Sequence, residues 1–159
     1  MTLKILAVLS LGLMCGSELN VAAFAHPTLN RQSLEVHILM RSSFAELFGQ
    51  VMPFWMGAST LLNLLLLLPF EHLNKRAWQF AAVAAAIQVV AVLFSLVGPV
   101  PINKRMVRWT PEALPDDWKV QEHRWDLYHW IRTCGLVALP NPSSSYKKSV
   151  EPATLTRRL

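Results

Sequence analysis

The chain has 159 residues, a length that suits one domain and is short for two. It is 53% hydrophobic and 16% charged, and its formal net charge is +5. The basic residues stand at the ends of apolar segments, where they can meet lipid headgroups, and no basic stripe carries interleaved aromatic rings. This distribution argues against nucleic acid as a partner.

Two long stretches of the sequence contain no ionisable side chain. They span residues 51–70 and 77–102, and each is at least as long as the roughly 20 residues that an apolar helix needs to cross a bilayer. Neither stretch shows a clear polar stripe at a 3.6-residue period, which a helix of a soluble protein normally has. We therefore predict an integral membrane protein that crosses the bilayer several times.

The first apolar segment, residues 4–25, permits two interpretations. Lys4, the apolar residues after it and Ala23-Phe24-Ala25 imitate a signal peptide with a small-residue cleavage site. Glu18 and Asn20 follow the apolar stretch, and the whole segment is long enough for one membrane helix. We favour a retained helix, and cleavage of the segment is the alternative.

Three further helices are predicted, over residues 44–68, 78–97 and 117–139. Pro53 predicts a kink in the second helix, Gly98-Pro99 ends the third, and Pro140 stops the fourth. The predicted fold class is all-α, an integral membrane four-helix bundle of up-down-up-down topology with a short last helix. Residues 1–139 would form this domain, and residues 140–159 would form a disordered basic tail.

The predicted fourth helix carries polar and aromatic side chains on one face. At 100° per residue, Trp125, His129 and Arg132 fall within about 60° of one another, and the opposite face is apolar. A polar group that faces hydrocarbon is costly, so His129 and Arg132 are expected to turn into the bundle. Four crossings also place the first and third connections on one membrane face, which brings His26 and Arg105 toward this end.

An inward histidine beside an arginine and tryptophan rings suits a planar, anionic or enolisable organic molecule. His129 would be the general base, since an unperturbed imidazole titrates near pH 6.5. Arg132 would stabilise negative charge that develops on an oxygen. The alternative is that both residues only tie the fourth helix to Glu18 or Asn103 by hydrogen bonds. Glu18 itself is either an interior ion-pair partner or an acid that carries a proton, and both interpretations stay open.

A metal site is not predicted. His123, Asp126 and His129 follow one another at three-residue intervals, with Glu122 adjacent. The two histidines lie about 120° apart around the helix, however, which is too far for easy chelation of one ion. A ligand from another helix would have to complete such a site.

Three short stretches of the sequence resemble the anthrone oxygenase-like family of small four-helix membrane proteins. They are His26-Pro27 after the first helix, residues 101–105 (PINKR) after the third, and residues 124–133 (RWDLYHWIRT) in the fourth. The last stretch looks like the RW-x3-H-x2-R signature of that family. With the spacing between them, the resemblance covers roughly residues 6–139.

The resemblance implies a chemistry as well as a fold. Some members of the family oxidise anthrones to anthraquinones with molecular oxygen and without a bound cofactor. By this analogy His129 is the base, Arg132 and Asn103 are the oxyanion donors, and Trp125 and His26 line the pocket. We add Glu18 and Arg105 as further substrate-binding candidates, and we predict no cofactor.

The last helix departs from the family pattern, because Pro140 ends it early. It would then cross only part of the bilayer, or a partner helix or a second copy of the chain would be needed. The predicted function is an oxygenase or monooxygenase of the membrane that acts on a hydrophobic, enolisable aromatic or polyketide-type substrate. The alternative is a non-catalytic membrane protein, either an accessory subunit of a complex or a binder of lipid or quinone.

Overall fold

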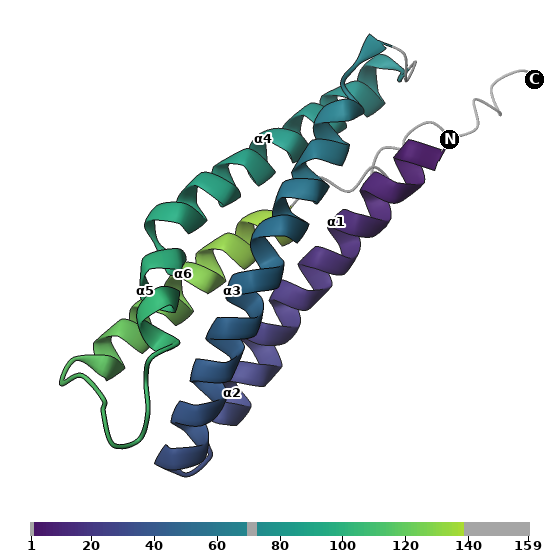
Figure 1. Ribbon diagram of the computed structural model, residues 1–159. Coiled ribbons are helices and arrows are strands. Elements are labelled where there is room, and N and C mark those ends of the chain that lie inside the picture. The colour runs from purple at the N-terminus through teal and green to yellow at the C-terminus, as the bar shows by residue number, and fades with distance from the viewer. Residues whose placement is uncertain (1, 70–72, 139–159) are drawn as a thin grey trace, which may run out of the picture.

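The computed structural model describes residues 2–69 and 73–138, and these residues are almost entirely helical (Figure 1). No strand occurs in this part of the chain, in which a single bridge joins Thr110 to Ala113. The predicted all-α class is therefore confirmed. The tail predicted over residues 140–159 lies outside the described residues.

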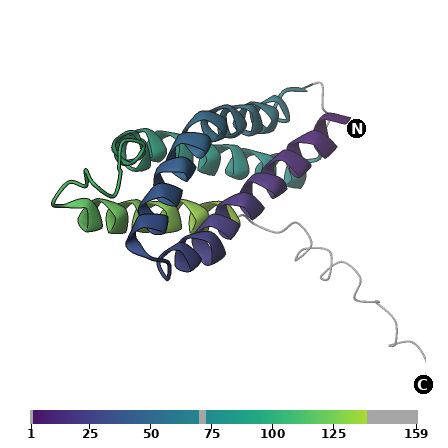
Figure 2. The same ribbon diagram turned by 60° about the horizontal axis from the view of Figure 1, so that its bottom comes forward.

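The helical segments follow one another in a simple order. They are α1 (Thr2–Asn20), the π-helical turn η1 (Val21–Ala25), α2 (His26–Leu29), α3 (Leu34–Leu65), α4 (Lys75–Val97), α5 (Pro99–Met106) and α6 (Trp118–Val137). Successive long helices run in opposite directions (Figures 1 and 2). α1 and α4 each contact both α3 and α6, so every long helix packs between two others.

The first helix is longer than the sequence predicted. Its backbone stays helical to Leu29, because η1 joins α1 to α2 without a break. The N–H of His26 donates to the carbonyl of Val21, five residues back. This wider turn directly precedes Pro27, whose ring and missing N–H would disrupt a regular α-helix. The helix end predicted at residue 25 is therefore one turn too early.

Two other helices also differ from their predicted bounds. α3 begins at Leu34 rather than at residue 44, so the segment 34–43 extends the predicted second helix at its start. Part of the connection predicted after α4 is helical as α5, in which Ile102 and Met106 are buried one turn apart. Pro99 is the first residue of α5, a position that its fixed φ suits.

Large polar side chains lie inside the molecule, while much of its outer surface is apolar. Arg41, Gln88 and Glu18 are among the largest fully buried side chains, whereas Phe54 is 81% exposed. Such an arrangement suits a lipid solvent, in which polar groups turn inward. The helical stretch Thr2–Leu29 and α4 are each long and apolar enough to span a membrane. These observations support a membrane protein.

Candidate functional site

Glu18, His129 and Arg132 form a buried group, here termed the Glu18 cluster, between α1 and α6. Nη2 of Arg132 lies 2.9 Å from Oε1 and 2.6 Å from Oε2 of Glu18, and Nε lies 3.1 Å from Oε2. Nη1 of Arg132 donates to Oγ of Ser95 on α4 at 2.9 Å. Arg132 is thus the ion-pair partner of Glu18, and the cluster links α1, α4 and α6.

Hydrogen bonds assign the tautomer of His129. Its Nε2 lies 3.0 Å from the backbone carbonyl of Glu18, which can only accept, so Nε2 carries the proton. Its Nδ1 lies 3.1 Å from Nη2 of Arg132 and 3.3 Å from Oε2 of Glu18. In the neutral ring Nδ1 accepts from Arg132. A proton taken up at Nδ1 would face the Glu18 carboxylate.

Trp125 covers the His129 ring on one side. The two rings are stacked with centroids 4.8 Å apart, and the indole also lies 4.7 Å from the ring of His26. Trp125 is only 8% exposed, and its Nε1 has no hydrogen-bond partner among the described residues. A buried donor without a partner costs free energy. The indole N–H is therefore enclosed and leaves its hydrogen-bonding capacity unused within the described part of the chain.

A cavity of about 410 Å³, here termed the main cavity, lies between α3, α4, α5 and α6. Its lining is mainly apolar, with Phe48, Met52, Met56, Val92 and Leu96 among its residues. The polar side chains that line it are those of Ser95, Asn103, Lys104, Trp125 and Arg132. An apolar space of this size with a few polar groups is typical of small-molecule sites.

A narrow cavity of about 30 Å³ adjoins the main cavity on the α1 side. The two cavities share Phe48, Met52, Trp125 and Arg132 in their linings, and the narrow one also reaches Glu18 and His129. His129 does not line the main cavity itself. The predicted base therefore lies behind the shared wall of Trp125 and Arg132.

Asn103 is held in the wall of the main cavity by α5. Its Nδ2 donates to the backbone carbonyl of Ala45 at 2.7 Å, which fixes α5 against α3. Gly49 makes this approach possible, because a Cβ at that position would lie 2.8 Å from Nδ2 of Asn103. A close contact between two helices, rather than a turn, accounts for this glycine.

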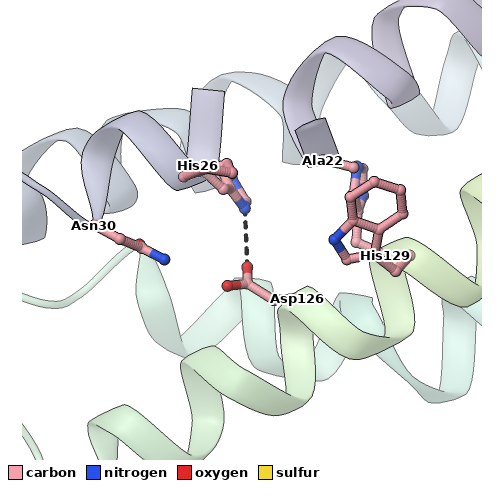
Figure 3. Close-up of a pocket in the computed structure, with 7 residues that line it drawn as sticks. Ala22, His26, Asn30, Asp126 and His129 are labelled. Atoms are coloured by element: carbon pink, nitrogen blue, oxygen red, sulfur yellow. Dashed lines mark hydrogen bonds and ion pairs between the residues drawn. The ribbon is translucent and has the colours of Figure 1, made fainter. Parts of the chain in front are cut away.

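His26 and Arg105, which the sequence predicted as substrate-binding, lie away from the main cavity. Nε of Arg105 donates to Oε1 of Gln121 at 2.8 Å and ties α5 to α6. His26 lines a separate cavity of about 150 Å³ together with Asn30, Asp126 and His129. Figure 3 shows His26 and Asp126 facing each other from α2 and α6.

Sequence reasoning missed a second buried group, here termed the Arg41 cluster, which consists of His26, His37, Arg41, Glu122 and Asp126. Arg41 is 1% exposed, and its Nη1 and Nη2 donate to the Asp126 carboxylate at 2.8 and 3.0 Å. Its Nε lies 2.9 Å from Oε1 of Glu122, which also contacts the ring of His37. Glu122 and Asp126 stand one turn apart, so helical periodicity could have indicated that they share a face.

Comparison with known protein families gives a match for the part of the chain that includes most of this site. The chain matches the family model described as anthrone oxygenase over residues 44–139, which is more than half of its length. The chain belongs to the anthrone oxygenase family. The predicted resemblance is thus confirmed, although Glu18 and His26 precede the part of the chain that matches the family. No curated protein and no solved structure matches the chain.

Proposed function

We propose that this member of the anthrone oxygenase family is a multi-pass membrane enzyme that oxidises an enolisable aromatic ketone with molecular oxygen. The main cavity carries the proposal. It offers an apolar space of ligand size, bounded by the donors Asn103, Trp125 and Arg132. His129 stands behind Trp125 and Arg132, within reach of the adjoining narrow cavity.

The membrane part of the proposal is an integral bundle in which α1, α3, α4 and α6 cross the bilayer in alternating directions. α6 has 20 residues, and a helix of that length spans roughly 30 Å, about the thickness of the hydrocarbon core. The exposed side of its second half includes Leu127, Ile131 and Val137, whereas Lys119, His123 and Arg124 are exposed in its first half. This division supports contact of the second half of α6 with lipid and places its first half near the headgroups.

The reaction oxidises a methylene carbon that is conjugated to a carbonyl group. A base removes one methylene proton, and the resulting enolate carbon forms a bond to molecular oxygen. Return of the proton gives a hydroperoxide, which loses water and leaves a second carbonyl. One CH2 group and one O2 thus become one C=O group and one water. The substrate supplies all the electrons that reduce oxygen.

We assign the proton transfer to His129 and the stabilisation of the enolate to its neighbours. Nδ1 of His129 would accept the proton after its hydrogen bond from Nη2 of Arg132 breaks, and Oε2 of Glu18, 3.3 Å away, would stabilise the resulting imidazolium. The amide of Asn103 would donate to the enolate oxygen, and the unpartnered N–H of Trp125 would also donate once the indole turns its enclosed Nε1 toward the cavity. Arg132 adds positive charge between these groups.

The direct test follows oxygen uptake by the purified protein in detergent with a set of anthrones. His129→Ala should reduce the rate by about 100-fold or more, as expected for the loss of a general base. His123→Ala is the matched control, because His123 is exposed on the same helix and lines none of the described cavities. Unchanged turnover in a folded His129→Ala variant would eliminate the base assignment, and no uptake by the wild-type protein would eliminate the oxygenase.

One observation favours a second candidate, a non-catalytic binder of a quinone or a lipid. The guanidinium of Arg132 is already bonded to Glu18, Ser95 and His129, which suits a structural tie between helices. Such a protein would bind a quinone in the main cavity without consuming oxygen. Quinone binding by wild-type protein that shows no oxygen uptake would select this candidate.

A further inference from the structure

The lining of the main cavity carries positive charge that is not fully balanced. Among the described residues that line it, Lys104 and Arg132 are the ionisable ones, and no carboxylate is present. The charge of Arg132 is matched by Glu18, whose Oε2 lies 2.6 Å away. Lys104 has no ion-pair partner within 4.0 Å in the described part of the chain. Its ammonium group is therefore free to pair with a ligand.

Lys104 lies just beyond the end of a potential membrane-spanning helix, where lipid headgroups are expected. α4 is apolar enough to span a membrane and ends at Val97, and Lys104 follows about two turns later on α5. Gly49, Pro53 and Leu96 line the cavity and are themselves exposed. The cavity thus opens on the outer surface between α3 and the α4–α5 segment. Its rim is apolar except at the end where Lys104 stands.

We infer that the main cavity takes an amphiphilic aromatic anion, whose carboxylate or phenolate pairs with Lys104. This inference rests on the proposed function and names the substrate class of the same site. The flat apolar body of such a molecule enters from the bilayer between α3 and α4, while its charged end stays among the headgroups. That orientation directs the far end of the ring system toward Trp125 and Arg132.

The charge at Lys104 also gives the site a means of selection. A neutral aromatic of the same shape fills the apolar part of the cavity equally well but leaves the ammonium group without a partner. An exposed ion pair of this kind changes affinity by about fivefold, because water and salt screen it. Lys104 is therefore a specificity-determining residue rather than a catalytic one.

Equilibrium binding to the purified full-length protein in neutral detergent tests the inference. The probes are anthracene-2-carboxylate and its methyl ester, which have the same ring system and differ in charge. Wild-type protein should bind the acid about fivefold more tightly than the ester. Lys104→Met should remove this preference, so that acid and ester bind with equal affinity, while Lys104→Arg should keep it. Arg108→Met is the matched control, since Arg108 is an exposed cation nearby that lines none of the described cavities.

Each outcome of this experiment has a distinct meaning. Equal wild-type affinity for acid and ester, or a preference that survives Lys104→Met, would overturn the inference and leave the oxygen-uptake proposal standing. A Lys104-dependent preference in a protein that consumes no oxygen would support the inference and reject only the oxygenase.

The binding measurement is repeated in phosphatidylcholine and phosphatidylglycerol nanodiscs. If wild-type protein prefers the acid in phosphatidylcholine but not in phosphatidylglycerol, the anionic headgroup occupies Lys104. That result would assign Lys104 to a lipid headgroup and overturn the substrate assignment.

Discussion

The two halves of α6 carry similar charged groups in different surroundings. The Glu18 cluster contains an arginine, a carboxylate and a histidine, and it borders an apolar cavity of about 410 Å³ through Arg132. The Arg41 cluster contains an arginine, two carboxylates and two histidines, and it borders a cavity of about 150 Å³ lined by His26, Asn30 and Asp126. The comparison teaches that buried ionisable groups alone do not mark a site. The feature that distinguishes the Glu18 cluster is the larger, mainly apolar cavity beside it.

The largest expected effect concerns the Arg41 cluster and is an effect on folding. Arg41→Met should lower the free energy of unfolding by about 3 kcal/mol, because Glu122 and Asp126 would remain inside without their cation. Thermal unfolding of the detergent-solubilised protein, followed by circular dichroism, measures the change. The oxygen-uptake rate per folded molecule should stay close to that of the wild-type protein.

Arg31→Met is the matched control for this prediction, since Arg31 is exposed in the connection before α3. A surface arginine outside any ion pair should change stability by no more than about 0.5 kcal/mol. If Arg41→Met lowered the free energy of unfolding no more than Arg31→Met does, the Arg41 cluster would not be a stabilising element of the fold.

A smaller effect, on catalysis, is expected at the wall of the main cavity. Trp125→Phe keeps an aromatic ring beside His26 and His129 but removes the indole N–H, which has no partner among the described residues. The turnover rate should fall by about 100-fold if this N–H donates to the enolate oxygen. The free energy of unfolding should not fall by the usual cost of a lost hydrogen bond, because the indole N–H makes no hydrogen bond to any described residue.

Oxygen-uptake kinetics and thermal unfolding of the same preparation separate these two effects. Trp125→Phe with a normal turnover rate would remove the indole from the proposed oxyanion donors. A lower melting temperature with normal turnover would mean that the indole is only a packing element. In that case Asn103 and Arg132 would remain as the proposed donors to the enolate oxygen.

The smallest expected effect concerns the spacing between α3 and α5. Gly49→Ala would place a Cβ 2.8 Å from Nδ2 of Asn103, so the amide must give up its bond to the carbonyl of Ala45. The loss should cost about 1 kcal/mol of stability and lower kcat several-fold, since Asn103 is a proposed donor to the enolate oxygen. Thermal unfolding and the substrate dependence of oxygen uptake measure the two effects.

Gly57→Ala provides the control on the same helix, because nothing lies within 4 Å of a Cβ at Gly57. Alanine is the better helix former, so this variant should be neutral or up to about 1 kcal/mol more stable. Equal behaviour of the two alanine variants would indicate that Asn103 is not held in place by its contact with α3.

Part of the site could be predicted because it depends on local periodicity. The 100° spacing of helical residues predicted that Trp125, His129 and Arg132 share a face, and the structure places all three on the inner side of α6. Gly98 and Pro99 indicated where α4 ends, and the helix ends at Val97. Such features follow from neighbouring residues, so they can be read without knowledge of the fold.

Other features depend on residues that are far apart in the chain. Arg41 looks like one of many interfacial basic residues, and only the bundle, in which α1 and α4 both pack against α3 and α6, brings it to Asp126, 85 positions later. The same holds for the wall of the main cavity, which combines residues from α3, α4, α5 and α6. The first helix was predicted to end before His26-Pro27, because nothing in the local sequence indicates the π-helical turn that accommodates Pro27.

The amino-acid sequence by itself determined the all-helical class, the membership of the family and the inward face of α6, since apolar runs and helical periods are local properties. Only the tertiary structure decided which carboxylate neutralises which arginine and where a ligand-sized space remains. Glu18 and Arg132 are 114 positions apart, and either could have had another partner. Charged groups in a poorly hydrated interior must pair with whatever the packed helices bring within reach, and that choice is made by the whole fold.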